Sequence, residues 1–217
     1  MPGYGSRIAK VYLLDDHDIV RRGLRDLLVA ARDIEVVGDS GSARGAARAI
    51  LDRGANVMVL DLQLQDGTGI EVCREVRAVD PSVSGLLLTS FDEDEALAAA
   101  ILAGAGGFIV KASRSADIIG AVRRLRGGRS MIDPALAGPV IERLKSQVPI
   151  PPLTDHEQHV LAYVLEGLTD REIADRMGMD LGPMGIDIAA LITRITSSTP
   201  EQGQPRSQSS LGKHRRS

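Results

Sequence analysis

The stretch "VMVLD" at residues 57–61 decides the fold of the first half of the chain. Its first four residues are all apolar, and a continuously apolar strand is typical of a sheet that is covered on both faces. Similar short apolar runs occur at residues 8–14, 34–37, 85–89 and 107–110. Longer stretches with helical spacing lie between these runs. Five strand–helix units in this alternation predict an α/β domain, a doubly wound parallel sheet with helices on both faces.

Polar residues mark the ends of these predicted strands. Asp15 and Asp16 follow the first strand, Asp61 follows the third, Thr89 ends the fourth, and Lys111 follows the fifth. Ligands of such sheets bind at the carboxyl ends of the strands, so we expect these side chains to converge. Crowded carboxylates repel one another unless a cation neutralises them, and oxygen ligands suit Mg²⁺ where a phosphoryl group also binds. The expected reaction is attack by a carboxylate on a phosphoryl donor, giving an aspartyl phosphate.

Each of these residues also has a purely structural interpretation. The pair Asp15 and Asp16 could cap a helix, and Asp61 could be a turn residue. Thr89 could be a strand-end hydroxyl bonded to backbone, and Lys111 could be a solvated charge. The joint pattern favours a shared site, because each residue lies at the end of its own strand in the order that such a site requires.

The composition is that of an ordinary globular protein. Of the 217 residues, 43% are hydrophobic and 25% charged, and the net charge is −3. Aromatic residues make up only 2%, which argues against a surface that stacks exposed bases. The single Cys73 excludes an internal disulfide and a cysteine-based zinc site. Neither a signal peptide nor a membrane span is predicted, so we expect a cytoplasmic protein without a membrane partner.

The chain divides into four parts by composition. The α/β pattern covers residues 7–127, and residues 128–152 form a linker with a short helix and a Pro-rich stretch. A small all-α segment follows at residues 153–197. The tail at residues 198–217 is rich in Ser, Gln and Pro, and we expect it to be disordered.

The first domain resembles the receiver domain of bacterial two-component response regulators. The matching pieces are "LLDDHD" (13–18), "VLDLQLQDGTGIE" (59–71), "LLLTS" (86–90) and "GFIVKAS" (107–113). The resemblance implies a flavodoxin-like, five-stranded parallel sheet. It also implies Asp61 as the residue that a sensor histidine kinase phosphorylates. Asp16 and Asp61 would be direct Mg²⁺ ligands, Asp15 would act through water, and the Gln63 carbonyl would be a further ligand.

The resemblance also assigns the residues around the phosphoryl group. Thr89 would bond to that group, Lys111 would pair with it, and Phe108 would be the aromatic residue that turns inward on switching. Phe108 could instead be an ordinary core aromatic. Many relatives have Pro where this chain has Gln65 and Ala112. Neither change touches a reacting group, so phosphorylation competence is expected to survive both.

Residues 153–197 resemble the helix-turn-helix domain of LuxR-type regulators, the NarL/FixJ subfamily. The matching piece is "LTDHEQHVLAYVLEGLTDREIADRMGM" (153–179). Thr169 as N-cap and Glu172 three residues later form a predicted capping box. The expected core residues of this domain are Val160, Leu161, Val164, Leu165, Ile173, Ala174 and Met177.

The predicted DNA-reading helix, "MDLGPMGIDIAALITRI" (179–195), keeps an apolar face and lacks a cationic one. The apolar positions are Met184, Ile188, Leu191, Ile192 and Ile195. Asp180 and Asp187 are the charges before Arg194, and residues 153–197 carry a net charge of −5 with His neutral. DNA affinity depends on neutralised phosphates, and base readout needs Arg, Lys, Asn or Gln. Arg171 and Arg194 are the remaining candidate DNA contacts, and both could equally be ordinary solvated arginines.

We therefore expect a response regulator that controls transcription through its C-terminal domain. Two mechanisms stay open: a DNA-binding dimer, or a phosphorylation-dependent protein partner or phosphoryl sink, which includes pairing with another regulator. An enzyme is a third class, since phosphatases with an aspartyl nucleophile have a similar acidic site. Those enzymes usually place a D-x-D arrangement after the first strand, whereas Asp15 and Asp16 are adjacent here. We expect that the protein is not an enzyme.

Overall fold

The computed structural model describes residues 8–90, 93–111, 115–132, 153–166, 168–180, 182–185, 187–188 and 190–191. Its strands are β1 (Ala9–Leu14), β2 (Ile34–Ser40), β3 (Val57–Asp61), β4 (Gln63–Leu64), β5 (Gly67–Thr68), β6 (Ser84–Thr89) and β7 (Gly107–Val110). Its helices are α1 (Asp18–Val29), α2 (Ala46–Asp52), α3 (Gly69–Val79), α4 (Glu93–Leu102), α5 (Ser115–Arg126), α7 (Asp155–Leu165) and α8 (Asp170–Met177).

Five strands form one parallel sheet in the order β2-β1-β3-β6-β7. Each of the five predicted runs forms one of these strands, so the predicted sheet is confirmed. All five residues of β3 are buried, as its continuously apolar sequence predicted. The pair β4 and β5 forms a separate antiparallel hairpin just after β3. That hairpin was not predicted, because two-residue strands carry no periodic signal.

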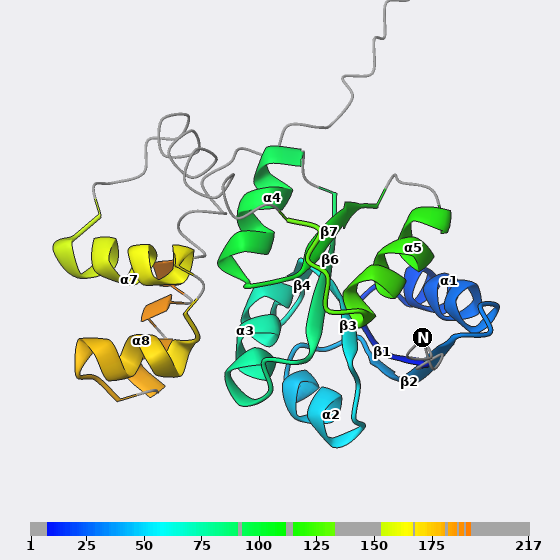
Figure 1. The fold of residues 1–217 in the computed structure, drawn as a ribbon, viewed down its shortest axis with the longest axis horizontal. Helices are drawn as coiled ribbons and strands as arrows, with labels where there is room; N and C mark the ends of the chain where they lie inside the picture. Colours follow the sequence, from blue (N-terminus) through cyan, green and yellow to red (C-terminus); the bar gives the residue numbers. More distant parts are fainter. Residues whose placement is uncertain are drawn as a thin grey trace, which may run out of the picture.

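Helices cover both faces of the sheet, as Figure 1 shows. Leu28 of α1 and Leu125 of α5 belong to the buried cluster on one face. Ile50 of α2, Ile70 of α3 and Leu102 of α4 belong to the cluster on the other. The receiver-like fold is therefore doubly wound, as predicted.

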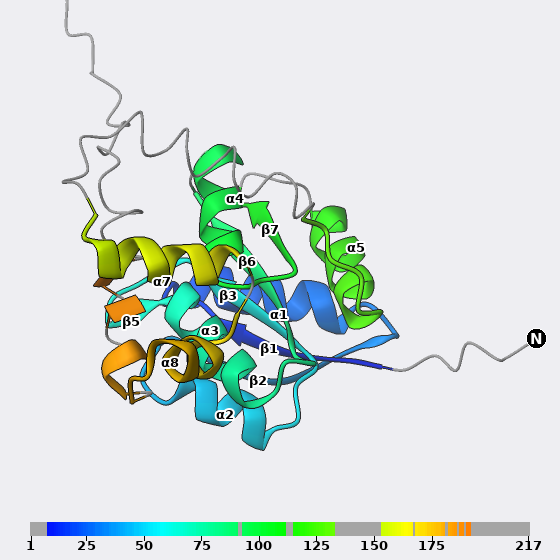
Figure 2. The same ribbon diagram turned by 60° about the vertical axis from the view of Figure 1, so that its left-hand side comes forward.

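The helices α7 and α8 lie beside α3 and α4 in both ribbon views (Figures 1 and 2). Each begins with a reciprocal capping box, Thr154 with Glu157 and Thr169 with Glu172. The second box confirms the prediction from sequence. The predicted core residues that the structure describes are buried or partly buried: Val160, Leu161, Val164, Ile173, Ala174 and Met177.

The described parts of the predicted reading helix, residues 182–185, 187–188 and 190–191, are helical. Met184, Ile188 and Leu191 are buried, which confirms the apolar face over this part. Pro183 and Ala190 are exposed on the other side. Ile192, Arg194 and Ile195 lie outside the described residues, so the predictions for them stay predictions.

Two predicted segments also lie outside the described residues. They are most of the linker, from residue 133 to residue 152, and the tail at residues 198–217. Within the part of the chain that the structure describes, no helix has the length and apolar character needed to span a membrane.

Candidate functional site

The acidic residues lie where the strand order of the sheet reverses. The chain passes from β1 outward to β2 and then returns to β3 on the other side of β1. The carboxyl ends of β1 and β3 flank the crevice at this switch point, the usual ligand position in such folds. Asp15 follows β1 and Asp61 ends β3, and both are buried. The structure therefore brings two of the predicted site residues together in a crevice that the topology creates.

Lys111 closes the site from the strand beyond β6. Its Nζ lies 2.5 Å from Asp61 Oδ2 and 3.2 Å from Asp15 Oδ2. The backbone N–H of Lys111 donates to the Thr89 carbonyl at 2.7 Å, so the end of β7 is tied to the end of β6. The alternative in which Lys111 is a free, solvated charge is therefore wrong.

The site has more negative than positive charge. Burial raises the pKa of Asp61, the charge of Asp15 adds to this, and the hydrogen bond from Lys111 only partly offsets it. Burial alone would lower the pKa of Lys111, but Asp61 and Asp15 outweigh that effect and raise it. One ammonium thus balances part of a cluster that also includes Asp16. A divalent cation would neutralise the remainder, and oxygen ligands of this kind fit Mg²⁺.

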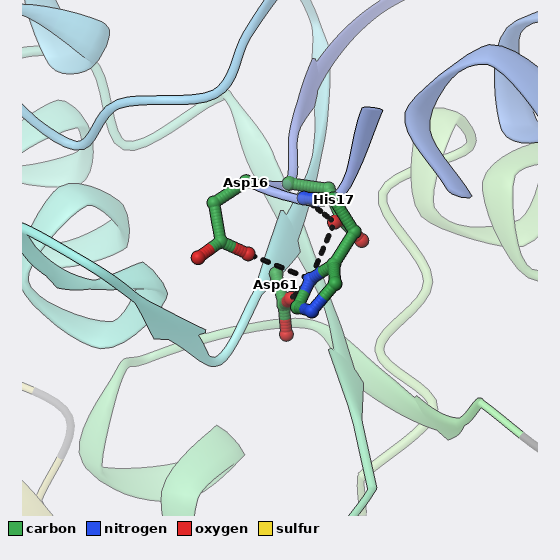
Figure 3. A group of neighbouring side chains, drawn as sticks. Asp16, His17 and Asp61 are labelled. Carbon is green, nitrogen blue, oxygen red and sulfur yellow. Dashed lines mark hydrogen bonds and ion pairs between the residues drawn. The ribbon is translucent and has the colours of Figure 1, made fainter. Parts of the chain in front are cut away.

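His17 lies in the same cluster, and the sequence analysis missed it. Figure 3 shows the side chains of Asp16, His17 and Asp61 turned toward one another. The Nδ1 atom of His17 is 2.7 Å from Asp16 Oδ1 and 3.9 Å from Asp61 Oδ2. Its position directly after Asp15 and Asp16 was the available signal. His17 is also the N-cap residue of α1, so neither aspartate has that role.

The other predicted site residues lie around this cluster. Thr89 is buried at the end of β6, and Leu88 before it pairs with Asp61. Phe108, on β7, is partly buried and packs against the core cluster on the α4 side of the sheet. Gln63 has an exposed side chain, and its backbone N–H bonds to Asp61.

The turn after Asp61 depends on Gly69, the first residue of α3. A Cβ at Gly69 would press into the Asp61 carbonyl oxygen and lie 3.1 Å from the Leu60 Cβ. The missing side chain therefore allows α3 to begin directly against the end of β3. Thr68 and Glu71 start this helix with a capping box.

Asp66 secures the hairpin that joins β3 to α3. It accepts hydrogen bonds from the Ser42 hydroxyl at 2.6 Å and from the backbone N–H of Ala43 at 2.8 Å. The Ser42 hydroxyl and these backbone donors lower the pKa of Asp66 to about 2. The loop after β3 is thereby attached to the loop after β2, beside the acidic cluster.

Arg74 of α3 joins the two parts of the chain. Its Nη1 donates to the Leu102 carbonyl at 2.7 Å, and its Nε donates to Asp170 Oδ1 at 2.7 Å. Asp170 is the first residue of α8, and its neighbour Arg171 is exposed. No sequence pattern predicts this contact, because the partners are 96 residues apart.

The chain is similar to known regulators along most of its length. Residues 11–123 match the response regulator receiver domain family. The DNA-binding transcriptional activator DevR/DosR of Mycobacterium tuberculosis is 42% identical over 174 residues, which cover 78% of this chain and 80% of that protein. The transcriptional regulatory protein LiaR of Bacillus subtilis is 31% identical, covering 89% and 93%.

A solved structure extends the similarity to both parts of the fold. The response regulator ChrA of a heme-sensing two-component system superposes with a TM-score of 0.51 at 27% identity. The match covers 88% of this chain and 97% of that protein.

Proposed function

Since the chain belongs to the response regulators of two-component systems, we propose that it is a cytoplasmic transcriptional regulator phosphorylated on Asp61 by a sensor histidine kinase. The observation that carries the assignment to Asp61 is the position of Lys111 Nζ, 2.5 Å from Asp61 Oδ2 and 3.2 Å from Asp15 Oδ2. An ammonium at this point can hold a phosphoryl oxygen once Asp61 has reacted.

In the proposed reaction, an Asp61 carboxylate oxygen attacks the phosphorus of the donor. The new O–P bond forms while the bond from phosphorus to the donor's leaving group breaks. Lys111 pairs with one phosphoryl oxygen, and the hydroxyl of Thr89 bonds to another. Phe108 then turns inward as Thr89 moves toward the phosphoryl group.

Asp16 and Asp61 are the proposed direct ligands of Mg²⁺, with the Gln63 carbonyl as a further ligand and Asp15 acting through water. The bound ion would supply positive charge to the phosphoryl oxygens. The fit is supported by the buried carboxylates of Asp15 and Asp61 and by the excess of negative charge that Lys111 leaves.

The direct test of Asp61 is labelling by acetyl phosphate in the presence of Mg²⁺. The wild-type protein should form a stable phosphoprotein, whereas an enzyme of the phosphatase class would turn the donor over. Asp61→Asn should abolish labelling, because an amide oxygen is a poor nucleophile. Asp26→Asn is the matched control, since Asp26 is an exposed carboxylate on α1, outside the acidic cluster. Undiminished labelling of Asp61→Asn would contradict the assignment.

We propose the following division of the chain. Residues 7–127 are the receiver domain and residues 153–197 the LuxR-type helix-turn-helix domain. Residues 128–152 link them, and residues 198–217 form a tail that lies outside the described residues. The capping boxes of α7 and α8 and their buried apolar residues support the second domain.

Control of transcription through DNA is supported by the relatives, and DevR/DosR is itself named as DNA-binding. Arg171, exposed on α8, is the proposed phosphate contact in the described part of the chain. Arg194 is proposed as a DNA contact of the reading helix because of its position in the sequence. Arg171→Ala should reduce the salt dependence of DNA binding by about 0.9 in the slope of log K against log salt, the value for one lost phosphate contact. Arg48→Ala is the control, because Arg48 is an exposed arginine on α2.

A second candidate function is favoured by the exposed side of the reading helix. Pro183 and Ala190 are exposed there, and Asp187 is paired with His156 Nε2 at 3.1 Å. A surface with these groups suits a protein partner, a second regulator or a copy of this chain, better than a phosphate backbone. A salt-titrated anisotropy assay with phosphorylated protein separates the two functions. A specific Kd of about 10 nM or below at physiological salt would refute the partner-only function.

A further inference from the structure

Asp66 binds the loop after β2 (residues 41–45) through three donors. Its Oδ1 accepts from the backbone N–H of Ala43 at 2.8 Å. Its Oδ2 accepts from the Ser42 hydroxyl at 2.6 Å and from the backbone N–H of Arg44 at 3.2 Å. With a pKa of about 2, Asp66 is ionised at neutral pH, and hydrogen bonds to an ionised acceptor are the stronger kind. One carboxylate therefore fastens the hairpin of β4 and β5 to a distant loop.

Gly67 allows the hairpin to lie directly against the same loop. A Cβ at Gly67 would be 3.0 Å from the Cβ of Ala43 and 3.3 Å from Glu71 Oε2. The contact therefore has two parts: Asp66 supplies the acceptor, and Gly67 lacks the side chain that would push the two segments apart.

The loop after β2 is in turn tied to the loop that carries Asp15. The backbone N–H of Asp15 donates to the Ser40 carbonyl at 3.1 Å. The Ser40 hydroxyl donates to the Ser42 carbonyl and accepts from the Ser42 N–H, both at 3.0 Å. A continuous set of hydrogen bonds thus runs from Asp15 through Ser40 and Ser42 to Asp66.

This set of hydrogen bonds crosses the end of one strand. In the sheet β1 lies between β2 and β3, so the bonds join the loops that follow the two outer strands of this trio. Asp61 ends β3, and the hairpin with Asp66 follows at once. Gln65 stands in the turn, so no proline fixes a backbone angle there. The conformation of the turn therefore depends on its bonds to neighbouring loops.

We propose that Asp66 is a positioning residue for the phosphorylation of Asp61: by holding the hairpin to the loop after β2, it keeps the Asp61 carboxylate oriented for attack on the donor. The inference rests on the proposed function, since it concerns the same reaction. The hydrogen bonds described for Asp66 go to residues 42–44, so Asp66 acts through the backbone that joins it to Asp61.

The test uses a graded set of variants of the full-length protein. Asp66→Ala removes the acceptor for all three donors, Asp66→Asn keeps one acceptor oxygen, and Ser42→Ala removes one donor. The matched control is Asp80→Ala. Asp80 accepts from the Ser82 hydroxyl at 2.6 Å and from the Ser82 N–H at 3.0 Å, in the turn before β6, at the other end of the sheet.

The first measurement is the rate of labelling by acetyl phosphate with Mg²⁺, as a function of acetyl phosphate concentration. At saturating donor the rate in Asp66→Ala should fall at least about tenfold, since a displacement of about 1 Å can cost about a hundredfold. The half-saturating concentration should stay unchanged, because Asp66 does not bind the donor. Asp66→Asn and Ser42→Ala should show smaller losses, and Asp80→Ala should show none.

The second measurement is hydrogen exchange of the Gln63 backbone N–H, which bonds to Asp61. Exchange at a single amide reports local opening and needs no phosphodonor. It should become faster in Asp66→Ala and stay unchanged in Asp80→Ala, with urea unfolding to show that both variants are folded.

Three results would overturn the inference. They are an unchanged labelling rate in Asp66→Ala, an equal loss in Asp80→Ala, and a slower rate without faster exchange at Gln63. A wild-type protein that is never labelled would instead refute the proposed function. The exchange measurement then still decides, by itself, whether Asp66 holds the turn after Asp61.

Discussion

Arg74 and Asp170 join two helices across the molecule, with Arg74 Nη2 only 2.5 Å from Asp170 Oδ1. Arg74 belongs to α3 of the sheet domain, and Asp170 begins α8 of the helical domain. The side chain of Arg74 is 6% exposed and that of Asp170 is 15% exposed. The same guanidinium donates to the Leu102 carbonyl at the end of α4. A single side chain therefore connects α3, α4 and α8.

Arg74→Ala should separate the helical domain from the sheet domain. Removing the guanidinium deprives Asp170 and the Leu102 carbonyl of this donor, and a buried polar group left unsatisfied costs about 1–3 kcal/mol. Asp170 can recover water if α8 moves away, so the expected change is an increased radius of gyration in small-angle scattering. The circular dichroism spectrum should stay unchanged, because the helices themselves remain folded.

The control for this prediction is Arg48→Ala. Arg48 pairs with Asp52 on the surface of α2, with side chains 81% and 57% exposed. An exposed pair of this kind contributes little to stability because solvent screens it. An unchanged radius of gyration in Arg74→Ala would show that other contacts hold the domains together.

Gly69→Ala should destabilise the protein and disturb the site. The added methyl group would press against the Asp61 carbonyl, so either α3 or the end of β3 must move. Overpacking of this kind costs about 1–3 kcal/mol, which urea unfolding measures.

Gly23→Ala is the matched control for the effect of the methyl group itself. Gly23 is exposed within α1, and a Cβ there meets nothing within 4 Å. The substitution should stabilise the protein by about 0.5–1 kcal/mol, because alanine loses less backbone entropy in a helix. If both substitutions change the free energy of unfolding by the same amount, then an added methyl group at Gly69 does not clash with the Asp61 carbonyl.

Asp61→Asn should raise the melting temperature at neutral pH when no divalent cation is present. Burial raises the pKa of Asp61 above its ordinary 3.8, so the folded state binds the proton more tightly than the unfolded state. The stability that such a group contributes is present below pH 3.8, and it is lost as the pH rises through the pKa of the group in the folded state. At neutral pH the ionised carboxylate is therefore destabilising, and the amide removes that effect.

The pH dependence and the metal dependence check this prediction together. The difference in melting temperature between Asp61→Asn and wild type should shrink as the pH is lowered toward 3.8, where Asp61 takes up its proton. Added Mg²⁺ should stabilise the wild type more than the variant, because the variant lacks one ligand charge. A wild-type protein that melts higher than Asp61→Asn without cation at neutral pH would contradict the sign of the effect.

Lys111→Ala should leave the fold intact and slow phosphorylation or weaken the response to it. The ammonium contacts Asp15 and Asp61 and makes no contribution to the buried apolar clusters. Its removal increases repulsion within the carboxylate cluster and takes away a partner of the phosphoryl group. The rate of labelling by acetyl phosphate and the circular dichroism spectrum give the two measurements.

Lys10→Ala is the control for the loss of a lysine. Lys10 is exposed on β1, one residue from the start of that strand and away from its carboxyl end. If Lys111→Ala changes neither the rate of labelling nor the response to phosphorylation, then Lys111 only balances charge in the unphosphorylated protein.

The acidic cluster was predictable only in part. The alternation of apolar runs with helical stretches places Asp15, Asp61 and Lys111 at the ends of predicted strands. Parallel strands have their carboxyl ends at the same edge of the sheet, so these residues were expected to lie close together. His17 was not predicted, because an imidazole after two aspartates carries no periodic signal. Nothing local distinguishes Arg74 from any other arginine on a helix.

The sequence by itself determined the parallel sheet, the acidic rim, the capping box of α8, and the apolar face of residues 184–191. These features depend on residues that are close along the chain, whose spacing decides which side of a strand or helix they occupy. Only the tertiary structure decided that His17 Nδ1 lies against Asp16 Oδ1 and that Arg74 reaches Asp170. The conformation of a loop fixes the first of these contacts. The packing of helices that are 96 residues apart fixes the second, and no short-range pattern specifies such packing.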